Sequence, residues 1–131
     1  MFSIRSNTSD RELVFRDLSG EYFTADLRGN DLRAAQAVCT YTDPLGLVRF
    51  FETLAAWEQP WRQPFEWRSL EDEFSISATC SPLGEVLFTV SISGQPGAPE
   101  EWQASFSITS ELGLLPSIAK AAKAFFRSPS A

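Results

Sequence analysis

Residues 74–92, FSISATCSPLGEVLFTVSI, alternate apolar and polar side chains on either side of a short turn that contains Pro and Gly. Such alternation is typical of a β-strand with one buried face, because successive side chains point to opposite sides of the strand. Residues 102–109, WQASFSIT, repeat the alternation after a Gly- and Pro-containing loop. Together these segments predict an antiparallel meander with an apolar face and a Ser/Thr face exposed to water.

Four further segments are predicted to add strands, namely residues 12–18, 21–27, 32–41 and 65–70. Residues 32–41 are rich in alanine, which by itself favours a helix. However, they follow RGND at residues 28–31, a tight-turn signal in which Gly and Asn tolerate positive φ. They also end in VCTY at residues 38–41, so a strand is favoured there.

Two amphipathic helices are predicted, one in the middle of the chain and one at its end. The first is expected to begin with Asp43 as N-cap and Pro44 at the first helical position. Its apolar stripe consists of Leu47, Phe50, Phe51 and Leu54. The second is expected to begin near residues 110–111, and its stripe consists of Leu115, Ile118, Ala119, Ala122, Phe125 and Phe126.

The predicted fold class is therefore α+β. We expect an antiparallel sheet of about six to seven strands, in the order β-β-β-α-β-β-β-β-α, packed against two helices. The 131 residues suffice for one domain. We assign it to residues 12–127, with a polar tail or short strand over residues 1–11 and a frayed C-terminus over residues 128–131.

The composition excludes several classes of function. The formal net charge of −6 disfavours a nucleic-acid partner, because phosphate-backbone binding depends on Lys and Arg. The chain contains no histidine, which rules out a Ser-His-Asp or Cys-His nucleophile and a His-ligated zinc ion. Cys39 and Cys80 have no metal-ligand spacing and are interpreted as small buried residues, with a disulfide between them left open.

The N-terminal residues and the lengths of the apolar runs indicate where in the cell the protein is expected. The first seven residues contain no continuous apolar region, which disfavours a secretory signal. No apolar run approaches the roughly 18 residues that span a bilayer. We therefore expect a cytoplasmic protein without a membrane partner.

Glu71, Asp72 and Glu73 are the candidates for carboxylate chemistry. Glycoside hydrolysis requires two carboxyl groups facing each other across a cleft, whereas neighbouring residues of a strand point to opposite faces. A calcium loop would interleave Asp or Asn with Gly, and this run does not. We therefore expect a turn with surface charge, no catalytic residue, no metal site and no cofactor, and hence not an enzyme.

Charge is unevenly distributed along the chain. Residues 69–119 contain no Lys or Arg, but they contain Glu71, Asp72, Glu73, Glu85, Glu100, Glu101 and Glu111. One interpretation is a solvated sheet face that keeps the protein soluble. The other is an anionic surface that attracts a basic partner protein. On the second interpretation the candidate partner-binding residues are Glu71, Asp72, Glu73, Glu85, Glu100 and Glu101.

Tryptophans cluster around the connector between the first helix and the second half of the chain. Trp57 is expected to cover the core where the helix ends. Trp61 lies between Pro60 and Pro64, where a stiff backbone leaves an indole partly exposed. Rigid exposed aromatic residues are good binding anchors, so Trp61 either anchors a partner or packs on the core. Trp61 and Trp67 complete the candidate partner-binding set.

The pattern YTDP (41–44), FFE (50–52), LAAW (54–57) and WRSLE (67–71) resembles a family of small uncharacterised bacterial domains over about residues 12–127. More distantly, the chain is similar to the WapI-type immunity proteins encoded beside polymorphic toxins. This resemblance implies a compact protein that neutralises a cognate toxin by binding it. No catalytic residues are implied by it.

The expected function is a non-catalytic protein-interaction module, in the sense of an immunity protein, whose acidic surface binds a toxin or another basic protein. The alternative is a small-molecule-binding domain with an apolar cavity between the sheet and the helices, near Phe50, Phe51, Phe125 and Phe126. A homo-oligomer is also left open, because exposed sheet edges pair readily.

Overall fold

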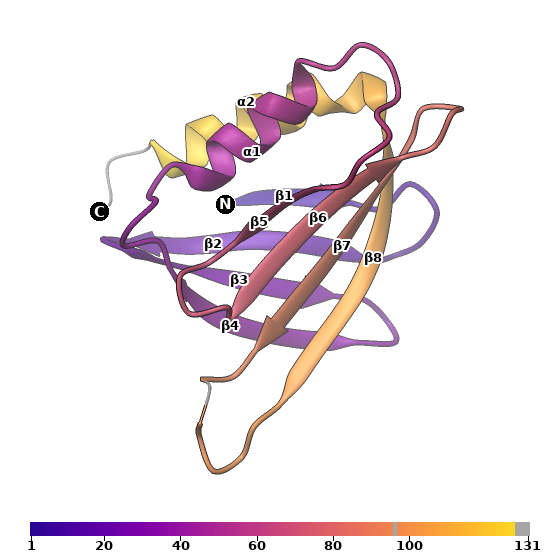
Figure 1. The fold of residues 1–131 in the computed structure, drawn as a ribbon. Helices are drawn as coiled ribbons and strands as arrows, with labels where there is room; N and C mark the ends of the chain where they lie inside the picture. The colour runs from indigo at the N-terminus through magenta and orange to yellow at the C-terminus, as the bar shows by residue number, and fades with distance from the viewer. Residues whose placement is uncertain (96, 128–131) are drawn as a thin grey trace.

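The computed structural model describes residues 1–95 and 97–127, which form two four-stranded antiparallel sheets and two α-helices (Figure 1). The first sheet consists of β1 (Phe2–Arg5), β2 (Glu12–Ser19), β3 (Tyr22–Arg28) and β4 (Arg33–Cys39). The second consists of β5 (Phe65–Arg68), β6 (Phe74–Cys80), β7 (Glu85–Ser93) and β8 (Gln103–Glu111). The helices are α1 (Gly46–Ala55), between the sheets in sequence, and α2 (Leu115–Phe126), which follows a short 3₁₀ turn.

The α+β class and the two helices are confirmed, but the single sheet of six to seven strands is wrong. Each sheet keeps its strands in chain order, and α1 with the connector after it separates β4 from β5. Alternation along a strand shows that the strand has a buried face, but it does not specify which strands are neighbours. Here the apolar faces of two local meanders bury each other, which one extended sheet could not do.

The N-terminal residues form the short strand β1 at the edge of the first sheet. Phe2 and Ile4 are buried and lie opposite Phe15 and Leu13 of β2. The polar residues that follow pack on the second sheet, where the backbone N–H of Asn7 donates to a β8 carbonyl. The expected frayed C-terminus, residues 128–131, lies outside the described residues.

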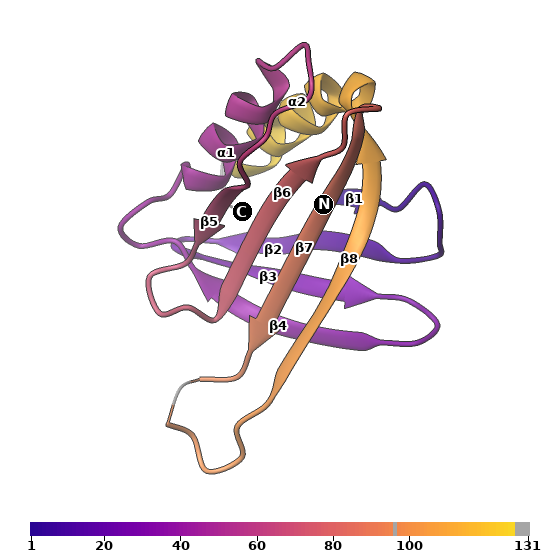
Figure 2. The same ribbon diagram turned by 45° about the vertical axis from the view of Figure 1, so that its right-hand side comes forward.

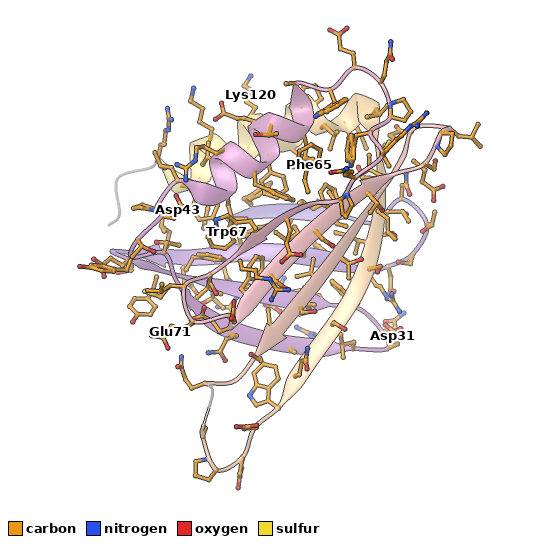
Figure 3. All side chains as sticks on the ribbon, viewed as in Figure 1. Asp31, Asp43, Phe65, Trp67, Glu71 and Lys120 are labelled. Atoms are coloured by element: carbon orange, nitrogen blue, oxygen red, sulfur yellow. The ribbon has the colours of Figure 1, made fainter. Side chains whose placement is uncertain are left out.

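The first helix begins later than expected, at Gly46, and Asp43 does not cap it. Instead, Asp43 Oδ2 accepts a hydrogen bond from Trp67 Nε1 at 3.1 Å, and Oδ1 accepts one from Arg49 (Figure 3). A Cβ on residue 46 would overlap both the carboxylate and the indole nitrogen, so glycine is required there. The carboxylate thus ties the start of α1 to β5 rather than satisfying the first backbone N–H groups of α1.

The core is continuous between both sheets and both helices, and phenylalanine dominates it. The ring of Phe15 lies 6.2 Å from that of Phe74 in the second sheet, 6.4 Å from Phe51 in α1 and 6.0 Å from Phe126 in α2. The predicted α1 stripe is buried throughout, whereas Ile118 and Phe125 of the α2 stripe are half-buried. Aromatic rings therefore occupy much of the space assigned to an apolar ligand.

Both helices lie together at one side of the two sheets, over β1 and β5 (Figures 1 and 2). At the opposite side, the β7–β8 hairpin extends past β4 (Figures 1 and 2). Cys39 and Cys80 are free, half-buried thiols. Within residues 1–95 and 97–127, no helix is long and apolar enough to cross a membrane.

Candidate protein-docking site

The carboxylates of residues 69–119 gather at the two ends of the second sheet. Glu71 and Asp72 in the β5–β6 turn, and Glu100 and Glu101 in the β7–β8 loop, belong to the end where β6 begins and β7 finishes. We call these four residues the acidic end. Glu85 and Glu111 lie opposite each other across β7 and β8 at the other end of the sheet.

Glu73 does not belong to this surface, although the sequence analysis included it. Its side chain is only 1% exposed and accepts a hydrogen bond from the Ser69 hydroxyl. The Ser69 hydroxyl oxygen also accepts the backbone N–H of Phe74 at 3.1 Å, and the Glu73 carbonyl accepts the N–H of Ser93 at 3.0 Å. Glu73 therefore holds the turn to the end of β7, where a partner cannot reach its carboxylate.

The remaining carboxylates of this stretch are exposed and mostly uncompensated. Asp72 approaches Arg68 at 4.0 Å, but in the described part of the chain no ion pair is made by Glu71, Glu85, Glu100, Glu101 or Glu111. Arginines of the first sheet and α1 are instead paired with Glu12, Asp17, Asp26, Asp31 and Asp43. The second sheet therefore carries exposed carboxylates that are mostly unpaired, whereas most carboxylates of the first sheet are paired with arginine.

Figure 3 makes this separation visible. Glu71 lies at the β5–β6 turn, whereas Lys120 lies on α2 at the opposite side of the molecule. Lys120, Lys123 and Arg127 make no ion pair among the described residues. Unpaired charges of one sign on one side attract a partner of the opposite sign over several ångströms of solvent.

Trp102, which the sequence analysis did not select, lies next to the acidic end and is 40% exposed. The N–H of Gly94 donates to the carbonyl of Trp102 at 3.1 Å, so the two residues face each other across the hairpin. A Cβ on Gly94 would lie 2.6 Å from Trp102 Nε1. The indole therefore packs directly on the glycine backbone, beside a hollow of about 390 Å³ that includes Glu101.

A signal for Trp102 was present in the sequence, in the form of a glycine and a tryptophan flanking the same hairpin loop. A glycine opposite an aromatic residue in a hairpin leaves room for the ring to lie across the backbone. The local sequence alone did not place Gly94 opposite Trp102, because seven residues lie between them and the register depends on tertiary packing.

Of the two alternatives left open for Trp61, the structure shows packing on the core. Its side chain is 4% exposed, and its Nε1–H donates to the carbonyl of Ala78 at 3.2 Å. The connector places this indole against β6, where its ring is buried and its N–H forms a hydrogen bond. Trp57 packs against Trp61 and Phe65 but is 42% exposed, so it covers the core only in part. Trp67 is half-buried and donates to Asp43, so neither Trp61 nor Trp67 is free to anchor a partner.

A second hollow lies around Trp57 at the opposite end of β5. It has a volume of about 450 Å³, and its lining residues are Trp57, Pro60, Trp61, Arg62, Gln63 and Phe65. The Trp57 ring lies 6.4 Å from that of Trp61 and 6.1 Å from that of Phe65. These rings pack against one another and form an apolar wall that is open to solvent on the side of Trp57.

The Asp43 carboxylate is the site of a clear pKa perturbation. Burial raises its pKa, but the hydrogen bonds from Trp67 and Arg49, together with the positive charge of Arg49, outweigh burial and lower it overall. Burial raises the pKa of the Cys80 thiol, which disfavours the reactive thiolate. Among the described residues, no group of three or more Cys, Asp or Glu side chains is placed to hold a metal ion.

The geometry defines a small two-sheet α+β domain with an acidic, indole-bearing surface at one end. The chain belongs to the DUF6228 family, a family of unknown function, which matches residues 5–129. No curated protein and no solved structure matches the chain. The resemblance to WapI-type immunity proteins therefore stays a prediction.

Proposed function

We propose that this protein is a non-catalytic interaction module that binds a basic region of a partner protein through the acidic end of its second sheet. The observation that carries the proposal is the placement of the exposed carboxylates of Glu100 and Glu101, which make no ion pair among the described residues, next to the exposed indole of Trp102, which packs on Gly94. The carboxylates attract and orient a basic partner, and the indole supplies apolar area that the partner covers.

The biological role that we propose is the one implied by the resemblance, namely neutralisation of a cognate toxin. An acidic module of this size blocks a basic surface by covering it and needs no chemistry of its own. Binding of this kind requires a prearranged surface, and an indole that packs on a glycine backbone loses little entropy when a partner orders it.

The proposal is tested by co-expressing the protein with the products of neighbouring genes and measuring the affinity of any complex at low and high salt. The double variant E100Q/E101Q removes two charges and preserves side-chain shape. We expect it to weaken binding by up to about tenfold and to reduce the salt dependence, since solvent-exposed ion pairs contribute roughly 0.2–1 kcal/mol each.

The matched control is E85Q/E111Q, which removes the same charge at the other end of the sheet. It should leave the affinity within about twofold, because screening limits charges that lie beyond a Debye length of roughly 8–10 Å. Equal losses in both double variants, or a partner that binds through an acidic surface, would contradict the proposal.

The small-molecule alternative is favoured by one observation, the apolar hollow of about 450 Å³ at Trp57. Pockets of this volume fall within the range that binds small ligands. A thermal-shift screen of aromatic and aliphatic compounds, followed by W57A, tests it. A ligand that raises the melting temperature of the wild type but not of W57A would establish this alternative.

A further inference from the structure

The two sheets have four edges, and three of them are covered over part or all of their length. The β1 edge lies against α2, and the β5 edge lies beside α1 (Figure 1). On β8, the Thr109 carbonyl accepts the N–H of Asn7 at 3.0 Å, and the Ser107 carbonyl accepts Arg11 Nη1 at 3.2 Å. In the described part of the chain, these contacts on β8 leave its first residues, 103–105, uncovered.

The fourth edge, β4, is open along its whole length. In the described part of the chain β4 pairs only with β3, in a continuous register of seven residue pairs without a bulge. The N–H of Thr40 donates to the carbonyl of Glu21, so even-numbered residues direct their backbone groups towards β3. The N–H and C=O groups of Arg33, Ala35, Ala37 and Cys39 therefore point to the open side.

This edge also lacks the usual protection against pairing. Natural edge strands are blunted by lysine, proline, bulges or very short length. The middle of β4 instead presents the exposed methyl groups of Ala35 and Ala37, which leave the backbone accessible from the side. Its single charged residue, Arg33, lies at the first position of the strand.

The β7–β8 hairpin forms a wall beside this edge. β7 contacts β4, and beyond that crossing the hairpin continues past β4 into solvent (Figures 1 and 2). By the alternation of β8, Trp102 shares a side with Ala104 and with Phe106, which packs into the core. The indole is thus on the side of the hairpin that faces the space next to β4.

We propose that the partner docks as an extended peptide segment that adds to β4 as a fifth strand of the first sheet, with the β7–β8 hairpin and Trp102 covering it. This inference rests on the proposed function, for which it specifies the mode of docking. Backbone hydrogen bonds to the odd-numbered residues of β4 supply the pairing, as in other cases of strand addition. The indole covers an apolar side chain of the segment.

The charges around β4 specify the segment further. Tyr22 lies opposite Cys39, and the pKa of Tyr22 is raised by the neighbouring Cys39 and by the carboxylates of Glu21 and Glu71. The two carboxylates place negative charge at this end of β4. Arg33 lies at the other end and makes no ion pair among the described residues. The segment is therefore basic where it passes Cys39 and the hairpin, and uncharged or acidic beside Arg33.

A second copy of the chain fits this edge less well than a lone segment. In a β4–β4 pair, each copy would need room for its own second sheet in front of its β4. The hairpin of the first copy already extends into that space (Figures 1 and 2). A single extended segment carries no second sheet and meets no such obstruction.

The probe for a first test is the capped heptapeptide KVKVTVT, which in antiparallel pairing places its lysines by Cys39 and its threonines by Arg33. Amide hydrogen exchange of the full chain is measured by NMR with and without the peptide. We expect exchange at Ala35, Ala37 and Cys39 to slow at least about fivefold, as one hydrogen bond of roughly 1 kcal/mol implies. Gln36 and Val38 already bond to β3 and should not change.

The variant A37P removes an open-edge N–H, and A37T is its matched control because it keeps that N–H. We expect A37P to weaken binding of KVKVTVT about tenfold, through one lost hydrogen bond and the obstructing ring, and A37T to bind as the wild type. The peptide EVEVTVT, in which glutamates replace the lysines, should not bind detectably. The wild-type exchange experiment does not depend on whether A37P folds.

The outcomes separate this inference from the proposed function. If binding of KVKVTVT depends on Glu100 and Glu101 but leaves the β4 amides and the A37P affinity unchanged, strand addition is overturned and the acidic docking surface stands. If KVKVTVT and EVEVTVT bind alike, both proposals are overturned. A wild-type dimer in sedimentation that A37P dissociates would assign β4 to a second copy and overturn the peptide assignment.

Discussion

The indole of Trp102 lies against the Cα of Gly94, so that a Cβ on residue 94 would come within 2.6 Å of Nε1. The two residues face each other across the β7–β8 hairpin, where the N–H of Gly94 donates to the carbonyl of Trp102. A methyl group at position 94 is therefore incompatible with the observed indole position. Because the indole lies beside the acidic end, the geometry of the hairpin determines where the aromatic part of the proposed docking surface lies.

Gly94→Ala should displace the Trp102 ring and expose it further. We expect a loss of about 1 kcal/mol in the free energy of unfolding, because the ring can rotate away into solvent. We also expect a loss of partner affinity similar to the loss caused by removing the indole in the variant W102A. Acrylamide quenching of tryptophan fluorescence measures the exposure. The control is Gly113→Ala, where a Cβ meets nothing within 4 Å and which lies outside the hairpin. An affinity loss as large in Gly113→Ala would contradict a specific role for the packing.

Gly46→Ala should destabilise the fold far more than an ordinary surface substitution. The new Cβ would overlap Asp43 and Trp67 and break the link between α1 and β5. We expect a loss of about 2–4 kcal/mol in the free energy of unfolding, measured by urea titration. Gly113→Ala is the matched control, since its Cβ meets nothing within 4 Å. Similar effects of the two changes would show that the Asp43–Trp67 contact does not support the fold.

The Asp43 carboxylate should make stability depend on pH. Its pKa is lowered in the folded protein, so the unfolded chain binds the proton more tightly. The stabilisation is therefore complete above the ordinary carboxyl pKa of 3.8 and is lost as pH falls through the lowered pKa. Urea titrations at neutral and acidic pH should show D43N less stable than the wild type near pH 7, with the difference shrinking in acid. E58Q, which removes an exposed carboxylate, should show no such convergence.

Trp61→Phe separates a structural from a binding role for this tryptophan. The Ala78 carbonyl would lose the hydrogen bond from the indole N–H, and the smaller ring would leave a cavity, so we expect a loss of about 1–3 kcal/mol in the free energy of unfolding. Partner affinity should not change, because the indole is buried. Isothermal titration of the folded variant provides the measurement. An affinity loss in W61F with native stability would restore Trp61 as an anchor.

The strands and helices were largely predictable because each has a periodic pattern of apolar residues along its buried side. The alternation in residues 74–92 and 102–109, and the helical spacing of Leu47, Phe50 and Phe51, all correspond to elements of the observed structure. β1 was assigned less clearly, because its buried side contains only two apolar residues, Phe2 and Ile4. Burial of one side acts on residues that are close in sequence, so local patterns reveal it.

The candidate site was only partly predictable, and the errors share one cause. Glu73 was assigned to the surface and Trp61 was left open between surface and core, but both are buried by partners outside the local pattern, namely the Ser69 hydroxyl and the Ala78 carbonyl. Trp102 was overlooked because its contact with Gly94 depends on the hairpin register. Whether a polar or aromatic side chain is exposed depends on such partners, which the local pattern does not specify.

By itself the sequence determined the two helices, most of the strands, and the presence of acidic residues without Lys or Arg over residues 69–119, since all of these depend on residue type and short-range spacing. Only the tertiary structure decided that the strands divide into two sheets, that arginines pair with the carboxylates of the first half, and that β4 is left open beside Trp102. These features arise where segments distant in sequence pack against each other. The free energy that selects among the possible packings comes from burying whole apolar faces of sheets and helices.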